Sequence, residues 1–108
     1  MKWFCRAARA EDGDGRGKRL RRRYRFYGQV QGVGFRYHAS MSARGLGLTG
    51  WVRNDRDGSV EMEAQGPKEL LDRLIEQLYS GRYIGIDDIE VRDIPERPDE
   101  RDFRVRML

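Results

Sequence analysis

The chain has 108 residues, enough for one domain and too few for two. It carries 22 Lys/Arg against 18 Asp/Glu, and its one cysteine, Cys5, excludes an internal disulfide and suits a reducing compartment. No apolar run approaches the roughly 20 residues that span a bilayer, and the first residues lack the pattern of a signal peptide. We therefore expect a cytoplasmic protein with no membrane partner.

The positive charge is concentrated at the start of the chain. Residues 1–23 hold nine Lys/Arg and three Asp/Glu, whereas residues 24–108 hold 13 and 15. The early composition is poor in residues that could form a core, which predicts a basic, disordered extension over residues 1–19 and a folded domain over residues 20–108. Two other interpretations remain: a basic arm that binds nucleic acid through its phosphates, and a mis-assigned start codon.

A strand is predicted first, from about Leu20, because apolar and polar side chains alternate there. A glycine-rich connection, "QGVGF", follows, and then apolar residues recur at helical spacing, with Arg36 in the first turn of the helix. The inward strand positions are Tyr24, Phe26, Gly28 and Val30, and the helical stripe is Phe35, Ala39, Ala43 and Leu46, with Gly45 and Gly47 as stop signals.

A hairpin comes next, with strands over residues 48–54 and 59–66 and the turn "DRDG" between them. A second helix is predicted over residues 66–81, with Pro67 at its first position. Two short strands end the chain, on either side of the loop "PERPDE". The hairpin's second strand directs Val60, Met62 and Ala64 inward and Glu61, Glu63 and Gln65 outward; the second helix has the stripe Leu70, Leu71, Leu74, Ile75 and Leu78; the last strands carry Ile89 and Val91, then Phe103, Val105 and Met107.

This order is β-α-β-β-α-β with a short extra C-terminal strand. It predicts an α+β, ferredoxin-like α/β sandwich with two helices on one face of a mainly antiparallel sheet. If the third strand lies between the first and the second, antiparallel to both, the first two strands point the same way. Their carboxyl ends then open on one edge, which would bring Arg36 and Asn54 to the same rim.

The connection between the first strand and the first helix allows two interpretations. Successive N–H groups at a helix start can form an anion site, which the guanidinium of Arg36 would strengthen. A glycine turn packed against the sheet, with Arg36 in solvent, fits the residues as well. A positive side chain in a first helical turn is mildly unfavourable, so Arg36 without an anion would be unusual.

Other motifs do not match. The glycines fit neither dinucleotide-binding nor Walker spacing. The stretch "DRDGS" is similar to an aspartate-nucleophile phosphatase signature, but here it closes a hairpin. His38 is the only histidine, which excludes a histidine metal cluster. We interpret Trp51 as a packing residue of the sheet rather than a stacking platform.

The stretch from Gly28 to Gly66, "GQVQGVGFRYHASMSARGLGLTGWVRNDRDGSVEMEAQG", resembles the acylphosphatase family. The shared signature is V-Q-G-V-x-F-R, then G-L-x-G-W-V-x-N, then D-G-x-V-E and a G-P before the second helix. The final "FRVRM" matches more loosely, since the family usually has a tyrosine at the position of Met107.

The resemblance implies the ferredoxin-like fold and hydrolysis of small-molecule acyl phosphates to a carboxylate and inorganic phosphate. It implies no metal, no cofactor and no covalent intermediate. Asn54 would orient the attacking water, and Arg36 would bind the phosphate together with the main-chain N–H groups of Gln31, Gly32, Val33, Gly34 and Phe35. Inorganic phosphate would be product and inhibitor, and a monomer is the expected state. The alternative is a non-catalytic ferredoxin-like module that binds an anion or nucleic acid through the arginine-rich extension.

Overall fold

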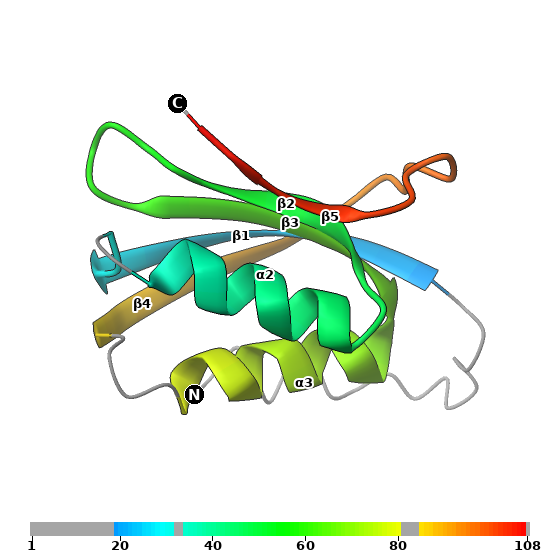
Figure 1. Ribbon diagram of the computed structural model, residues 1–108, viewed down its shortest axis with the longest axis horizontal. Helices are drawn as coiled ribbons and strands as arrows, with labels where there is room; N and C mark the ends of the chain where they lie inside the picture. The colour runs from blue at the N-terminus through cyan, green and yellow to red at the C-terminus, as the bar shows by residue number, and fades with distance from the viewer. Residues whose placement is uncertain (1–18, 32–33, 81–84, 108) are drawn as a thin grey trace.

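Two helices pack on one face of a five-stranded sheet in the computed structural model, which describes residues 19–31, 34–80 and 85–107 (Figure 1). The strand order is β4-β1-β3-β2-β5, and only β2 and β5 run parallel. This confirms the ferredoxin-like prediction and places the extra C-terminal strand beside β2. The elements are β1 (Arg19–Gln29), α2 (Phe35–Gly45), β2 (Thr49–Asn54), β3 (Val60–Pro67), α3 (Lys68–Tyr79), β4 (Gly85–Ile94) and β5 (Phe103–Arg106).

The central strand, β3, aligns its two neighbours. Val60 pairs with Phe26 of β1 on one side and with Asn54 of β2 on the other, both antiparallel. Strands β1 and β2 therefore point the same way, and their carboxyl ends lie at one edge of the sheet. This confirms the predicted topology and defines the rim on which the candidate site is built.

The core lies between the sheet and the two helices, as the apolar periodicities predict. In β1, Tyr24 and Phe26 are fully buried, and their rings stack with centroids 6.1 Å apart. Phe35 of α2 meets the ring of Phe26 edge to face at 5.3 Å. Burying one such large apolar side chain contributes roughly 1.5–3 kcal/mol. The other core residues are Val30, Ala39, Ala43, Leu48, Val52, Val60, Met62, Ala64, Leu71, Leu74, Ile75, Leu78, Ile89 and Phe103.

The arginine run at residues 19–23 is part of β1, so Arg19, the last residue of the predicted extension, begins the first strand. Arg21 is 1% exposed and forms ion pairs with Glu63 at 2.8 Å and Glu100 at 2.7 Å. Arg22, on the other face, pairs with Asp72 of α3 and Asp93 of β4. These charges are therefore not available to an outside polyanion. Residues 1–18 lie outside the described residues, and their predicted disorder stays a prediction.

The outward face of β3 is also buried, contrary to the solvent exposure that its alternation suggests. Glu61 points away from the helices but is 1% exposed. Its carboxylate pairs with the guanidinium groups of Arg23, Arg25 and Arg53 on the neighbouring strands. Buried charges require such partners because a lone buried carboxylate is strongly disfavoured. The outward side of the sheet thus forms a second, ionic layer.

Two element ends differ from the sequence prediction. Pro67, the predicted first helical residue, is the N-cap of α3 with an extended backbone, because it still pairs with Arg19 as the end of β3. The helix therefore begins one residue later, at Lys68. In β5 only Phe103 is buried, while Val105 and, directly after the strand, Met107 are exposed. The strand lies at the edge of the sheet, beside β2. No helix among residues 19–31, 34–80 and 85–107 is long and apolar enough to cross a bilayer.

Replacing Gly50 by alanine should destabilise the protein strongly. Gly50 has φ +145°, and a Cβ there would overlap the main-chain carbonyl oxygen of Glu63 in the paired strand. We expect Gly50→Ala to lower the free energy of unfolding by at least about 2 kcal/mol, measured by urea denaturation. Gly45→Ala is the control, since nothing lies within 4 Å of its Cβ position. It should raise stability by up to about 1 kcal/mol. Equal effects of the two changes would contradict the close approach of β2 to β3.

Candidate active site

Arg36 lies at the rim, in the first turn of α2, as predicted. Gly34 precedes the helix with φ 105° and ψ −29°, and this left-handed conformation favours glycine although space for a Cβ is open. No side chain caps this helix start, and no acidic residue lies in its first turn. The first N–H groups of α2 and the guanidinium of Arg36 therefore have no anionic side chain near them in sequence. Gly32 and Val33, two of the predicted phosphate ligands, lie outside the described residues.

Arg36 differs from every other shielded arginine in the described part of the chain. Six arginines there are buried or half-buried, and five of them pair with a carboxylate. Arg36 pairs with none of the described carboxylates. Among the described residues, its Nε is buried without a hydrogen-bond partner, and its Nη1 forms one hydrogen bond, with the thioether sulfur of Met107 at 3.5 Å. The five paired residues are Arg21, Arg22, Arg23, Arg25 and Arg53.

Asn54 is the last residue of β2, and its Oδ1 is buried without a donor among the residues described. Met107 links it to Arg36 in space. Arg106 pairs with Arg53 in the parallel β2–β5 ladder, so the next residues, Met107 and Asn54, lie side by side at its end. Because the Arg36 guanidinium reaches Met107, Arg36 and Asn54 share one rim, as the topology predicts. A buried polar atom left unpaired costs about 1–3 kcal/mol, so two on one rim indicate a site for water or a ligand.

Gln31 connects the two halves of this rim in a way that the sequence does not reveal. Its Nε2 donates to the main-chain oxygens of Asp55 (2.6 Å) and Ser59 (2.9 Å), the two ends of the turn after β2. The Asp55 carboxylate accepts a hydrogen bond of 2.6 Å from Arg25, which lowers the pKa of Asp55. The residue after Asn54 is therefore held from two sides. Sequence motifs cannot predict this contact because its acceptors are main-chain carbonyls 24 and 28 residues away.

The remaining candidates have structural roles. Phe35 places its ring in the core, so only its main-chain N–H is left for the predicted phosphate binding. The "DRDGS" stretch is a turn in which Asp57 accepts hydrogen bonds from the N–H and the hydroxyl of Ser59. Trp51 is 9% exposed beneath two guanidinium groups, which confirms packing over base stacking. His38 contacts the carbonyl of Gln77 on α3. Within the described ranges, no three metal-ligating side chains gather into a cluster.

Comparison with known proteins identifies the family of the chain. The acylphosphatase family model matches residues 22–105. The chain belongs to the acylphosphatase family. An acylphosphatase of Bifidobacterium longum is 54% identical over 69 residues, which are 63% of this chain and 71% of the relative. An acylphosphatase of Koribacter versatilis is 45% identical over 85 residues, 78% of this chain and 77% of the relative.

A solved acylphosphatase has the same architecture. The crystal structure of acylphosphatase from Bacillus subtilis superimposes with a TM-score of 0.74 at 37% identity, covering 80% of this chain and 97% of that one. The resemblance read from Gly28 to Gly66 is therefore confirmed, as are the fold and the hydrolase class expected with it. The assignment of individual residues to phosphate binding or catalysis stays a prediction.

Inorganic phosphate should stabilise the folded protein through Arg36. A ligand present at 100 times its Kd adds about 2.7 kcal/mol to folding stability, which raises Tm. We expect phosphate to raise the Tm of the wild type and to leave that of Arg36→Ala unchanged, as measured by thermal unfolding at constant ionic strength. Arg73→Ala is the matched control, because Arg73 is exposed on α3. It should respond as the wild type does, and loss of the response in both variants would indicate nonspecific screening.

Proposed function

We propose that this protein hydrolyses acyl phosphates to a carboxylate and inorganic phosphate, with Arg36 and Asn54 as its catalytic residues. One observation carries the proposal: the guanidinium of Arg36 is half-buried at a helix start without a carboxylate partner among the described residues, on the rim that holds Asn54. Membership of the acylphosphatase family supports the substrate class.

The phosphate would bind in the loop Gln31–Phe35, against its main-chain N–H groups and Arg36. Helix N-termini attract anions because their N–H groups are unsatisfied and the helix dipole is positive there. The planar guanidinium matches two phosphate oxygens at once, and each charge-assisted hydrogen bond contributes about 1.5–3 kcal/mol. Phosphoryl transfer depends chiefly on positioning and charge stabilisation, and this arrangement provides both.

The water would be oriented by Asn54. An asparagine amide is no useful base at neutral pH, but its Oδ1 can accept a hydrogen bond from water, and that atom is free of donors among the described residues. The oxygen of the water bonds to phosphorus while the bond from phosphorus to the acyl oxygen breaks. The electron pair leaves with the carboxylate, and the proton goes to an oxygen of the substrate. Because a carboxylate is a good leaving group, no histidine or carboxylate base is required.

Further properties belong to the same proposal. The reaction would need no metal ion and form no covalent intermediate, since water attacks phosphorus directly. Inorganic phosphate would compete with substrate for Arg36. The protein would act as a monomer in the cytoplasm, the compartment that its single cysteine suggests. The basic segment before β1 has no role in this mechanism, and nothing among the described residues favours the nucleic-acid alternative.

The direct test is steady-state hydrolysis of acetyl phosphate and benzoyl phosphate in the presence of EDTA, with p-nitrophenyl phosphate as the phosphomonoester control. The wild type should hydrolyse the acyl phosphates and leave the monoester intact. Arg36→Ala should lower kcat/KM by at least about 10²–10³-fold. Arg36→Lys should be impaired as well, because a point charge lacks the planar fork, while Arg73→Ala should match the wild type. Wild-type protein without acyl phosphatase activity would refute the proposal.

Asn54→Ala should separate catalysis from binding. Removing the amide leaves the N–H cradle and Arg36 in place, so inorganic phosphate should inhibit with an unchanged inhibition constant, or stabilise to the same Tm. The loss of an oriented water should lower kcat by about 10²–10³-fold, the size seen when one polar group of an active site is removed. An equal loss of phosphate affinity would instead place Asn54 in the phosphate site.

A further inference from the structure

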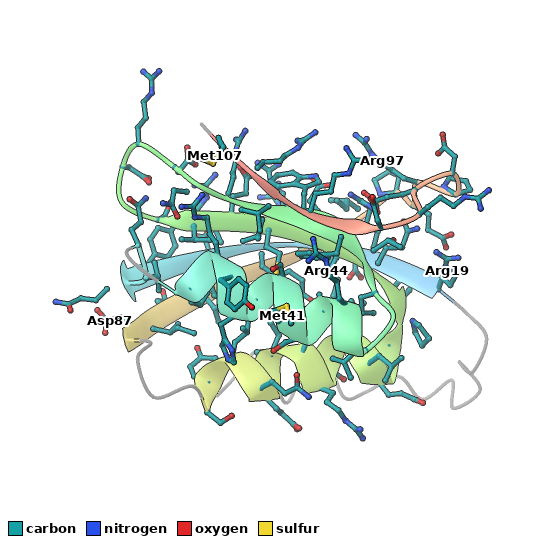
Figure 2. The ribbon with its side chains drawn as sticks, viewed as in Figure 1. Arg19, Met41, Arg44, Asp87, Arg97 and Met107 are labelled. Carbon is teal, nitrogen blue, oxygen red and sulfur yellow. The ribbon has the colours of Figure 1, made fainter. Side chains whose placement is uncertain are left out.

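Met107 is the residue in contact with the free guanidinium. It directly follows β5, lies beside Asn54 at the end of the β2–β5 ladder, and is 75% exposed. Figure 2 shows its side chain at the end of β5, close to the C-terminus of the chain. Its Sδ accepts the only hydrogen bond that the Arg36 guanidinium makes with the residues described, from Nη1 at 3.5 Å.

A thioether is a weak acceptor and carries no charge. It can hold a guanidinium by contact without neutralising it, whereas a carboxylate would compete with an incoming phosphate. The other shielded arginines of the described chain, such as Arg21 and Arg53, are all held by carboxylates. Arg36 alone among them rests on sulfur, so its charge stays available at the rim.

We propose that Met107 is a positioning residue for Arg36, and that oxidation of its thioether to a sulfoxide makes phosphate binding sensitive to peroxide. This inference rests on the proposed function. In the reaction, hydrogen peroxide transfers one oxygen atom to Sδ and is reduced to water, while the sulfur is oxidised and no proton is lost. A sulfoxide reductase with a thiol reductant returns the sulfur to the thioether.

The sulfoxide changes the contact from weak to strong. Its oxygen carries partial negative charge and accepts a charge-assisted hydrogen bond from the guanidinium that now touches the sulfur. Phosphate would then have to displace this oxygen from Arg36 before binding. By the usual strength of hydrogen bonds to charged groups, the apparent affinity for phosphate and for substrate should fall roughly tenfold or more. The turnover number should change little, because substrate at saturation displaces the oxygen.

The chain contains a matched control for this idea. Met41 is the other exposed methionine of the described residues, 47% exposed on the outward side of α2 (Figure 2). It lies five residues after Arg36 and therefore on a different face of the helix. Met62 is fully buried in the core. Peroxide should thus reach Met41 and Met107 alike, but only oxidation of Met107 should alter Arg36.

The experiment compares wild type, Met107→Leu and Met41→Leu, each before and after mild hydrogen peroxide. Mass spectrometry of peptides reports the oxidised residue, and KM for acetyl phosphate and the inhibition constant of inorganic phosphate report binding. Wild type and Met41→Leu should lose affinity roughly tenfold and regain it with methionine sulfoxide reductase. Met107→Leu should resist peroxide, and its untreated KM should rise only a few-fold. Cys5 is present in all three proteins, so its oxidation cannot produce the difference.

Two results would overturn the inference: an equal peroxide effect in wild type and Met107→Leu, or unchanged binding in protein whose Met107 is shown to be oxidised. If the untreated wild type hydrolyses no acyl phosphate, the proposed function fails and phosphate-induced stabilisation still tests the contact. Peroxide should then reduce the rise in Tm for the wild type and leave that of Met107→Leu intact. Met107→Gln, with a permanent amide acceptor, should reproduce the oxidised state without peroxide.

Discussion

The arrangement of the whole rim depends on the pairing of β3 with β1 and β2. An antiparallel strand between two others forces the outer two to run the same way, so the loop that leaves β1 and the turn that leaves β2 meet at one edge. Arg36 follows the first of these strands and Asn54 ends the second. The contact of Gln31 with both ends of the β2–β3 turn then sets how the two connections lie relative to each other. The geometry of this rim is a consequence of strand order.

Electrostatics divide the molecule into two regions. On the sheet face away from the helices, guanidinium and carboxylate groups cover each other, and Glu61 with its three arginines is the centre of that layer. At the rim, the guanidinium of Arg36 has no described carboxylate partner, and the start of α2 has no acidic cap. A charge shielded from water but left unpaired is costly unless an anion binds it. The same residue type thus has countercharges that stabilise the fold in one region, and in the other region it has none among the described residues.

Much of the fold could be predicted because it depends on local pattern. Alternation in β1 and β3 and the helical stripe of α2 identify the core, and the motif around Arg36 and Asn54 identifies the family. The countercharges of buried arginines are what the sequence does not reveal. Arg21 belongs to a run of basic residues, yet it is buried because Glu63 and Glu100, distant in sequence, supply its countercharges. The composition of a segment gives its polarity, but it does not show whether distant parts of the chain supply countercharges to that segment.

The sequence by itself determined the order of the helices and strands, most of the side chains that fill the core, and the family to which the motif belongs, because these follow from spacing and residue type. Only the tertiary structure decided that β5 lies beside β2, that Gln31 binds the turn after Asn54, and that Met107 touches Arg36. These contacts join residues far apart in the chain through main-chain atoms or single soft contacts. Such contacts produce no periodicity or motif in the sequence, and the packing of the whole sheet determines which residues make them.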